Sequence, residues 1–280
     1  MAKNEWGLGY ASLKAIYRRV FVSVTTYVAA AWYDRTNQPQ RQKLIMAQRY
    51  CLMKITGAYR TTAASSLTTI LAVTPIHLEC EKAVAYYKLR KGEEIIFRNI
   101  RIQARQRVMA RESPEGRAYE RQAKQRIGAE ITRAWQEEWD NSISGRLTFK
   151  YLPLIRERLQ MYWMIPNKWI FQVLSGHGTF NVFRKKCKFR ETDHCRYCGK
   201  TDDNEHAIKE CEYFEETRRV YSRIMQFGAV DVSVWIRRRD TYGALEQLAS
   251  EVLKPKQRED MIECNELRRR RQRRNERENE

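Results

Sequence analysis

Apolar side chains recur every three or four residues in the first part of the chain, which is the spacing of one face of an α-helix. The first such stretch covers residues 13–31, and the second covers residues 44–55 with Gln48 as a polar exception. Asn37, two positions before a proline, is typical of the start of the second helix. Gly57 is typical of its end. The pattern therefore predicts two amphipathic helices joined by a short loop.

Two shorter apolar stretches follow, one beginning at Ser65-Ser66 and one at Pro75. The loops between all these stretches are short, and helices joined by short loops pack side by side in a bundle. Residues 1–92 are therefore predicted to form a compact helical bundle.

The character of the chain changes after Gly92. Residues 93–116 carry an arginine-rich run without acidic residues and then Ser113-Pro114, which predicts a basic linker. Residues 117–183 predict a helical connector, in which a long polar helix ends near Trp139 and shorter apolar stretches follow.

The C-terminal third predicts two further parts. Residues 184–228 contain a cluster of cysteines followed by one amphipathic helix. Residues 229–280 contain an apolar stretch over 244–252 and then a basic charged tail with almost no apolar side chains. The composition of this tail predicts either disorder or a solvated helix. The fold class predicted for the whole chain is mainly α.

The charge balance gives information about the binding partner of the chain. Lysine and arginine number 53 against 34 acidic residues, a formal net charge of +19 over 280 residues. An excess of this size favours a polyanionic partner, most often nucleic acid. The alternative is a basic protein whose charge only keeps it in solution.

The cysteine cluster has the spacing C-x2-C-x7-H-x4-C, formed by Cys195, Cys198, His206 and Cys211. Two cysteines two residues apart can aim both thiolates at one point, and a later histidine and cysteine complete a tetrahedron around Zn²⁺. Four protein ligands leave no open position for water. The cluster therefore predicts a structural CCHC zinc module, with Zn²⁺ coupled to its folding, and not a hydrolytic centre.

Two nearby residues, His194 and Cys187, compete for the role of ligand. His206 is preferred, because His194 is adjacent to Cys195 and would crowd the tetrahedron. The polar residues between the ligand pairs, 202–205, are interpreted as turn formers.

Basic runs flank the cluster and fill the predicted linker, and such runs bind phosphates by releasing counterions. The run beside the cluster has the best case, because it adjoins Phe189. An aromatic ring there, or the ring of Tyr197, stacks on a base or else packs in the module's own core. The predicted nucleic-acid contacts are Arg98, Arg101, Arg105, Arg184, Lys185, Lys186, Lys188, Arg190 and Tyr197.

Other candidate residues have a structural interpretation. Trp135, Trp139, Trp163 and Trp169 fit packing between helices. His177 lies between two glycines and has no nucleophile or carboxylate partner in the sequence pattern, so we do not expect it to be catalytic. The chain as it stands is predicted not to be an enzyme.

Several segments resemble the part of non-LTR (LINE-type) retrotransposon reverse transcriptases that runs from the thumb onward. The resemblance is strongest to the arthropod group that inserts into ribosomal RNA genes, and it covers residues 8–225 in the family's order. It implies a thumb-like bundle, followed by a helical linker and the zinc module. The segments that carry it are 13–17, 27–32, 47–49, 55–61, 73–79, 135–139, 145–146, 174–178 and the cysteine cluster.

The chain departs from this family in its catalytic part. The aromatic-Ala-Asp-Asp motif of the polymerase palm is absent, and the one Asp-Asp pair, Asp202-Asp203, lies inside the cysteine cluster. The upstream endonuclease domain is also missing. The expectation is a detached C-terminal piece, either a degenerate genomic copy or a fragment of a longer gene, that does not polymerise alone.

The resemblance implies RNA or DNA as partner, specifically the element RNA or the target DNA, and a larger reverse transcriptase polypeptide as a further partner. The alternatives are a zinc-dependent protein–protein adaptor and an accessory subunit that works with a separate palm. The apolar stretch over residues 20–32 is too short to span a bilayer and no signal peptide is present. We therefore expect a nuclear or cytoplasmic protein without a membrane partner.

Overall fold

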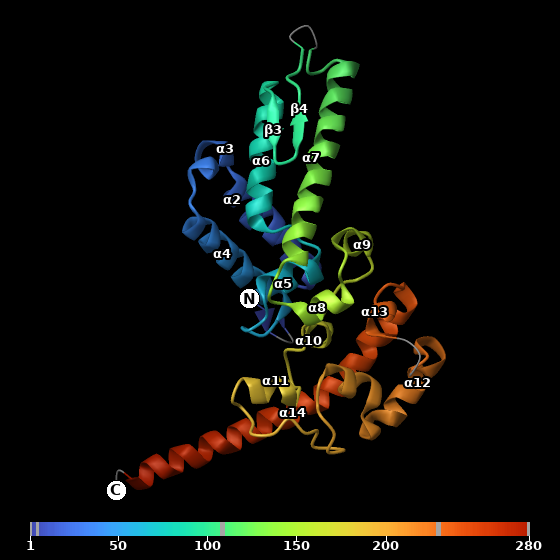
Figure 1. Ribbon diagram of the computed structural model, residues 1–280. Helices are drawn as coiled ribbons and strands as arrows, with labels where there is room; N and C mark the ends of the chain where they lie inside the picture. The colour runs from blue at the N-terminus through green and yellow to red at the C-terminus, as the bar shows by residue number, and fades with distance from the viewer. Residues whose placement is uncertain (1, 4–5, 107–109, 228–230, 279–280) are drawn as a thin grey trace. The chain divides into compact units, whose positions relative to one another are not determined.

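The computed structural model describes residues 2–3, 6–106, 110–227 and 231–278. The chain divides into two compact units, Met1–Gln160 and Met161–Glu280. The prediction of a mainly α fold is confirmed, since helices make up most of both units (Figure 1).

The first unit begins with short elements. Strands β1 (Ala2–Lys3) and β2 (Trp6–Gly7) pair antiparallel. A series of short helices then replaces the single helix predicted over residues 13–31: α1 (Tyr10–Ile16), the π-helix η1 (Tyr17–Val22), α2 (Ser23–Thr26), α3 (Ala29–Trp32) and the 3₁₀ turn η2 (Tyr33–Arg35). The break falls at Val28, whose φ is 47°. The break allows Ala29 and Tyr33 to be buried in a cluster with residues of α6. The apolar periodicity of one continuous helix does not predict this packing.

The next three helices follow the sequence pattern closely. Helix α4 (Gln38–Thr56) starts with a capping box between Asn37 and Gln40 and ends at Gly57, which is in the left-handed region. Helices α5 (Ala64–Leu71) and α6 (Ile76–Lys91) follow, with Pro75 as the N-cap of α6.

A β-hairpin occupies part of the segment predicted as a linker. Strands β3 (Ile95–Phe97) and β4 (Ile100–Ile102) pair antiparallel and lie beside α6 and α7 (Pro114–Asp140), as Figure 1 shows. The apolar side chains of Ile95, Phe97 and Ile102 are buried in a core cluster with both helices. The arginines in this segment favoured the prediction of a basic linker, although buried and exposed residues alternate along it.

The first unit closes with α8 (Arg146–Tyr151) and α9 (Ile155–Gln160). Trp135 and Trp139 of α7 are buried in the same core cluster, and the indole N–H of Trp139 donates to the carbonyl of Leu152 at 2.8 Å. The structural interpretation of these two tryptophans is confirmed.

Gln48, the polar exception in the apolar face of α4, is a buried connector. Its side-chain amide donates to the hydroxyl of Tyr17 at 2.8 Å and to the carbonyl of Thr74 at 2.9 Å. Its side-chain oxygen accepts the backbone N–H of Ile76 at 3.0 Å. One amide thus joins η1, α4 and the start of α6.

Replacing Gln48 by alanine is expected to lower the free energy of unfolding by about 3 kcal/mol, because buried groups of three neighbours lose their partner. Gln42→Ala, on an exposed position of the same helix, is the matched control and should change it by no more than about 0.5 kcal/mol. Chemical denaturation of the two variants and the parent measures both values. Equal stability of the two variants would show that the buried amide contributes nothing.

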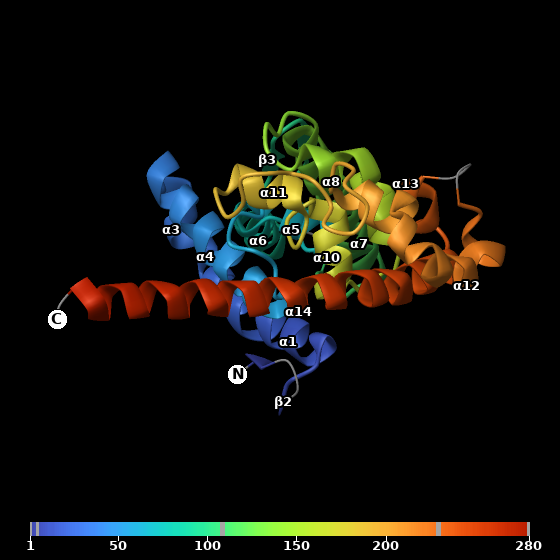
Figure 2. The ribbon, with the colours of Figure 1, turned by 90° about the horizontal axis from the view of Figure 1, so that it is seen from below.

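The second unit is built around one long helix. Its elements are α10 (Lys168–Ser175), α11 (Asn181–Lys186), the π-helix η3 (His206–Glu210), the 3₁₀ turn η4 (Glu212–Phe214), α12 (Glu215–Met225), α13 (Val232–Trp235) and α14 (Arg239–Glu278). Helices α10, α12 and α13 and the turn η3 all contact α14. Figure 2 shows α14 as one continuous rod.

Helix α14 joins two parts that the sequence pattern kept separate. The stretch predicted as a helix over 244–252 and the charged tail are one helix, which continues through Pro255. Of the two alternatives for the tail, the structure has the helix, as far as Glu278. Across the described ranges, no helix combines the length and the apolar character needed to cross a membrane.

Candidate metal centre

Cys195 and Cys198 are carried by a tight turn in the second unit. His194 and Thr201 form an antiparallel bridge at its base. Within the turn the N–H of Cys195 donates to the carbonyl of Lys200 at 2.6 Å, and the N–H of Gly199 donates back to the carbonyl of Cys195 at 2.9 Å. Gly199 has a φ of 75°, a conformation that favours glycine, and this lets the chain reverse directly after the second thiol.

The other two members of the cluster lie at the two ends of η3. The carboxylate of Asp203 accepts the N–H of His206 at 2.7 Å and fixes the first residue of the element. At the other end, the N–H of Cys211 donates to the carbonyl of His206 at 2.8 Å. One turn of π-helix therefore holds the histidine and the last cysteine on the same side.

The four ligand atoms form a compact group, all within 4.8 Å of one another. The sulfur of Cys211 lies 3.8 Å from that of Cys195 and 3.9 Å from that of Cys198. The sulfur of Cys198 lies 3.3 Å from Nε2 of His206. Tetrahedral zinc with ordinary bond lengths requires edges of about 3.8 Å between sulfurs and about 3.6 Å between sulfur and nitrogen. The donor set and its spacing fit such an ion.

The two competing ligands lie outside this group. Neither His194, whose side chain is exposed, nor Cys187, which is half-buried, belongs to the group of ligand atoms within metal-binding distance. The preference for His206 over His194 agrees with this geometry.

Burial shapes the protonation of the ligands. It lowers the pKa of His206, although Asp202 acts in the opposite direction, so the imidazole is neutral at physiological pH. Burial also raises the pKa of the Cys211 thiol to about 12 in the metal-free chain. A metal ion bound here displaces that proton, so its binding free energy is linked to proton release.

Asp202 has a larger part in the structure than that of a turn former. Its carboxylate accepts hydrogen bonds from Lys256 Nζ at 2.8 and 2.9 Å and from the N–H of Asn181 at 3.0 Å. The side chains of Asp202 and Lys256 are 0% and 5% exposed. This buried ion pair ties the segment between the ligand pairs to α14, and the sequence pattern did not predict it.

The basic run before the cluster is split between two environments. Arg184 and Arg190 form ion pairs with the acidic residues Asp260 and Glu263 of α14. Lys185 pairs with Asp193 at 3.3 Å on the surface. The other part of the run is solvent-exposed: Lys186, Lys188 and Phe189, whose side chain is 72% exposed. Within the described part of the chain, no acidic residue pairs with Lys186 or Lys188.

Tyr197 is engaged in contacts within its own unit. Its ring stacks on Tyr213 with centroids 4.3 Å apart, and Phe214 meets it edge-on at 5.4 Å. Its hydroxyl donates to Glu259 at 2.7 Å. The two aromatics considered for base stacking thus differ, since Phe189 is exposed and Tyr197 is packed.

The three predicted contacts of the first unit lie on and beside its hairpin. Arg98 pairs with Glu81 at 2.7 Å, and Arg101 pairs with Glu94 at 2.5 Å. Arg105 is half-buried, and none of the described residues forms an ion pair with its side chain. The structure therefore does not bring these three arginines together with the metal centre in one compact unit.

The other residues singled out in the second unit pack against neighbours within that unit. Trp169 is buried, and the half-buried Trp163 donates its indole N–H to the carbonyl of Ile236 at 3.4 Å. The ring of His177 stacks on Phe183 with centroids 4.7 Å apart, and burial lowers its pKa.

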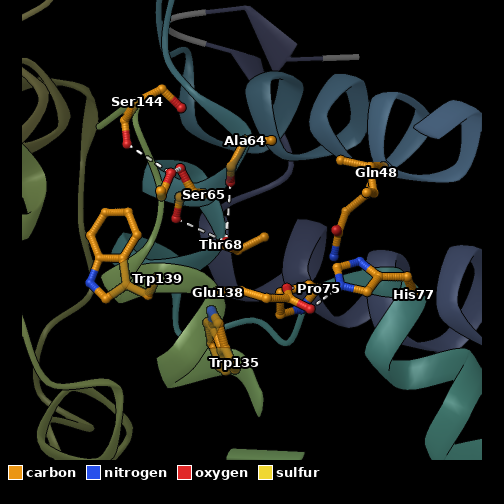
Figure 3. Close-up of a pocket in the computed structure, with 12 residues that line it drawn as sticks. Gln48, Ala64, Ser65, Thr68, Pro75, His77, Trp135, Glu138, Trp139 and Ser144 are labelled. Atoms are coloured by element: carbon orange, nitrogen blue, oxygen red, sulfur yellow. Dashed lines mark hydrogen bonds and ion pairs between the residues drawn. The ribbon is translucent and has the colours of Figure 1, made fainter. Parts of the chain in front are cut away.

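A pocket of about 250 Å³ in the first unit brings distant segments together (Figure 3). Gln48, His77 and Trp139 line it, and His77 Nε2 lies 2.9 Å from the carboxylate of Glu138. These residues come from segments 47–49, 73–79 and 135–139, which carry the family resemblance. Three of those segments therefore meet at one place in the fold.

Comparison with curated proteins finds sequence similarity to retrotransposon polyproteins. The Pol polyprotein of the type-1 retrotransposable element R1 4 from Nasonia vitripennis is 31% identical over 219 residues, 78% of this chain. This chain is a homologue of arthropod R1 Pol polyproteins. A second Nasonia vitripennis polyprotein, from element R1 2, is 26% identical over 78% of the chain, and one from Bradysia coprophila is 25% identical over 88%.

The chain spans about half the length of the two Nasonia relatives, 53% and 51%, and 24% of the Bradysia protein. No family model matches the chain. No solved structure matches it either.

Proposed function

We propose that this chain is a nucleic-acid-binding part of an R1-type Pol polyprotein, in which Zn²⁺ organises the second unit. The observation that carries the proposal is the compact group of Cys195, Cys198, His206 and Cys211 in a homologue of retrotransposon polyproteins. Cys₃His is a donor set that structural zinc prefers, and zinc-organised modules commonly present basic and aromatic side chains to nucleic acid. The ligand is RNA or DNA of the element or its target.

The exposed contacts of the second unit are Lys186, Lys188 and Phe189. Both ammonium groups are open to solvent, and Phe189 offers an exposed ring between them and Arg190. Two cations beside a ring suit one or two phosphates and a stacked base of a single strand. Tyr197 supports the module from inside.

The chain is further proposed not to polymerise by itself. Its one Asp-Asp pair has structural partners, because Asp202 is bonded to Lys256 and Asp203 holds the N–H of His206. These partners support the proposal that the pair does not hold a catalytic Mg²⁺ ion. Nucleotide incorporation by the purified chain on a primed RNA template would contradict this.

The binding test uses fluorescence anisotropy with labelled single-stranded RNA and DNA over a series of salt concentrations. Affinity is expected to fall steeply with salt, and Lys186→Gln/Lys188→Gln should reduce the salt slope by about two because two phosphate contacts are lost. Lys254→Gln/Arg223→Gln removes the same charge from two exposed positions of the second unit and should leave the slope close to that of the parent.

The other functions predict different results. A zinc-dependent protein–protein adaptor should show only the weak, non-specific binding at low salt that a net charge of +19 supports. An accessory polymerase subunit should copurify with a palm-containing polypeptide. A slope that both double variants lower equally would show that net charge, and not the surface beside the metal centre, carries the binding.

A further inference from the structure

Three guanidinium groups in the second unit converge on one carboxylate. Arg196, inside the metal-binding turn, approaches Asp260 of α14 with Nη2 at 3.1 Å from Oδ1. Arg184 forms an ion pair with the same oxygen, and Nη2 of Arg190 lies 3.7 Å from it. Arg196 also pairs with Glu259 of the same helix, with Nη1 at 3.0 Å from the carboxylate, so the arginines meet an acidic face of α14.

A third carboxylate of α14, one helical turn beyond Asp260, completes the cluster. Glu263 pairs with Arg190, and it also accepts from Arg196 at 3.1 Å. Its side chain is 42% exposed, whereas that of Asp260 is 15% exposed. The outer carboxylate therefore faces solvent, and the inner one lies within the arginine cluster.

The arginines are partly withdrawn from water and have donors to spare. The side chains of Arg184 and Arg190 are 15% and 19% exposed. Nε of Arg190 is buried, and no described residue accepts a hydrogen bond from it. Guanidinium groups bind tetrahedral phosphate oxygens through several parallel N–H donors, which one planar carboxylate does not fill. The cluster thus has the composition of a phosphate site.

We infer that Arg184, Arg190 and Arg196 form a phosphate-binding site for the backbone of a nucleic acid, and that Asp260 and Glu263 of the same chain occupy it until nucleic acid arrives. This inference rests on the proposed nucleic-acid binding. The carboxylates stand where phosphate oxygens bind, so the two compete. When phosphate groups replace the carboxylates, every arginine still has an anionic partner. Helix α14 stays in place through its separate bond between Lys256 and Asp202.

Occupation by the chain's own carboxylates has a measurable consequence. The free energy of binding includes the loss of the internal ion pairs, so intrinsic affinity for the nucleic-acid backbone is masked. Removing the competing charges while keeping the side-chain shapes exposes that affinity.

The test compares Asp260→Asn/Glu263→Gln with the parent in the zinc-loaded full chain, using labelled single-stranded RNA and DNA. The double variant should bind about tenfold more tightly, because two competing carboxylates are neutralised. Adding Arg184→Gln/Arg190→Gln to this variant should remove the gain. Glu266→Gln/Glu216→Gln removes two exposed carboxylates of the same unit and should give a much smaller gain.

The possible outcomes separate this inference from the proposed function. If no variant binds either nucleic acid at low salt, the proposed function fails and the inference fails with it. If the parent binds with a steep salt dependence and Asp260→Asn/Glu263→Gln binds no more tightly, the inference alone is wrong. An equal gain in the Glu266→Gln/Glu216→Gln variant also overturns it. If the double variant loses zinc or folds poorly, the single variant Glu263→Gln, at the exposed edge of the cluster, replaces it in the comparison. Its affinity should rise by less than that of the double variant, and no rise in affinity would contradict the inference.

Discussion

Cys211→Ser should abolish zinc binding and unfold the metal-binding part of the second unit. The cysteine is fully buried and its sulfur contacts those of Cys195 and Cys198, so its loss opens the tetrahedron. Structural zinc contributes about 10–16 kcal/mol to the folding of small zinc modules, which is as large as the whole free energy of unfolding of a typical domain. The parent should contain about one zinc ion per chain, the number that a single Cys₃His site holds.

Metal content by mass spectrometry and limited proteolysis measure this result. Cys187→Ser is the matched control, because Cys187 is close in sequence and lies outside the ligand group. It should keep the metal and the parent's proteolytic pattern. Full zinc content in Cys211→Ser would show that the cluster is not the metal site. A stable, protease-resistant second unit after complete removal of the metal by a chelator would show that the ion does not organise the fold.

Lys256→Met should lower the free energy of unfolding by about 3–5 kcal/mol, because it leaves the Asp202 carboxylate buried without its cation. The hydrogen bond from the N–H of Asn181 remains, but it does not neutralise the charge.

Lys254→Met, two residues earlier on the exposed side of α14, is the control and should change stability by about 0.5 kcal/mol or less. Thermal or denaturant unfolding of both variants gives the comparison. Asp202→Leu/Lys256→Met removes both charges and should recover part of the loss, because a buried pair replaced by apolar groups is often neutral. A loss below about 1 kcal/mol in Lys256→Met would mean that the pair is hydrated and contributes as a surface ion pair does.

The helices of the first unit were predictable where local signals mark both ends. Asn37 and Gly57 carry the capping chemistry of α4, and their role follows from residue type alone. The break at Val28 has no such signal, because a β-branched residue rarely adopts a positive φ. Val28 is itself exposed, and the buried contacts are made by Ala29 and Tyr33 after the break. The β-hairpin was not predicted because its strands are only three residues long and Ile96 is apolar although it is exposed, so the alternation of apolar and polar residues is broken. The whole segment was therefore assigned to the basic linker.

The metal ligands were predictable because the spacing of the cysteines and the histidine along the sequence is typical of a tetrahedral zinc site. The partners of the surrounding charges were not, since they lie on α14, more than fifty positions further along the chain. One signal was present: Glu259, Asp260 and Glu263 form an acidic group in an otherwise basic segment. Acids at such a spacing on one face of a helix indicate a basic partner, and here the structure places three arginines there.

We propose that zinc builds a surface that binds nucleic acid, and this rests on both the homology to R1 Pol polyproteins and the metal centre. The most direct measurement is the affinity of the full chain for labelled single-stranded RNA and DNA, before and after removal of zinc, at about 50 and about 200 mM salt. We predict salt-dependent binding that weakens strongly on removal of the metal and returns when zinc is restored. Binding that is unchanged by loss of the metal, or absent in both states, would contradict the account.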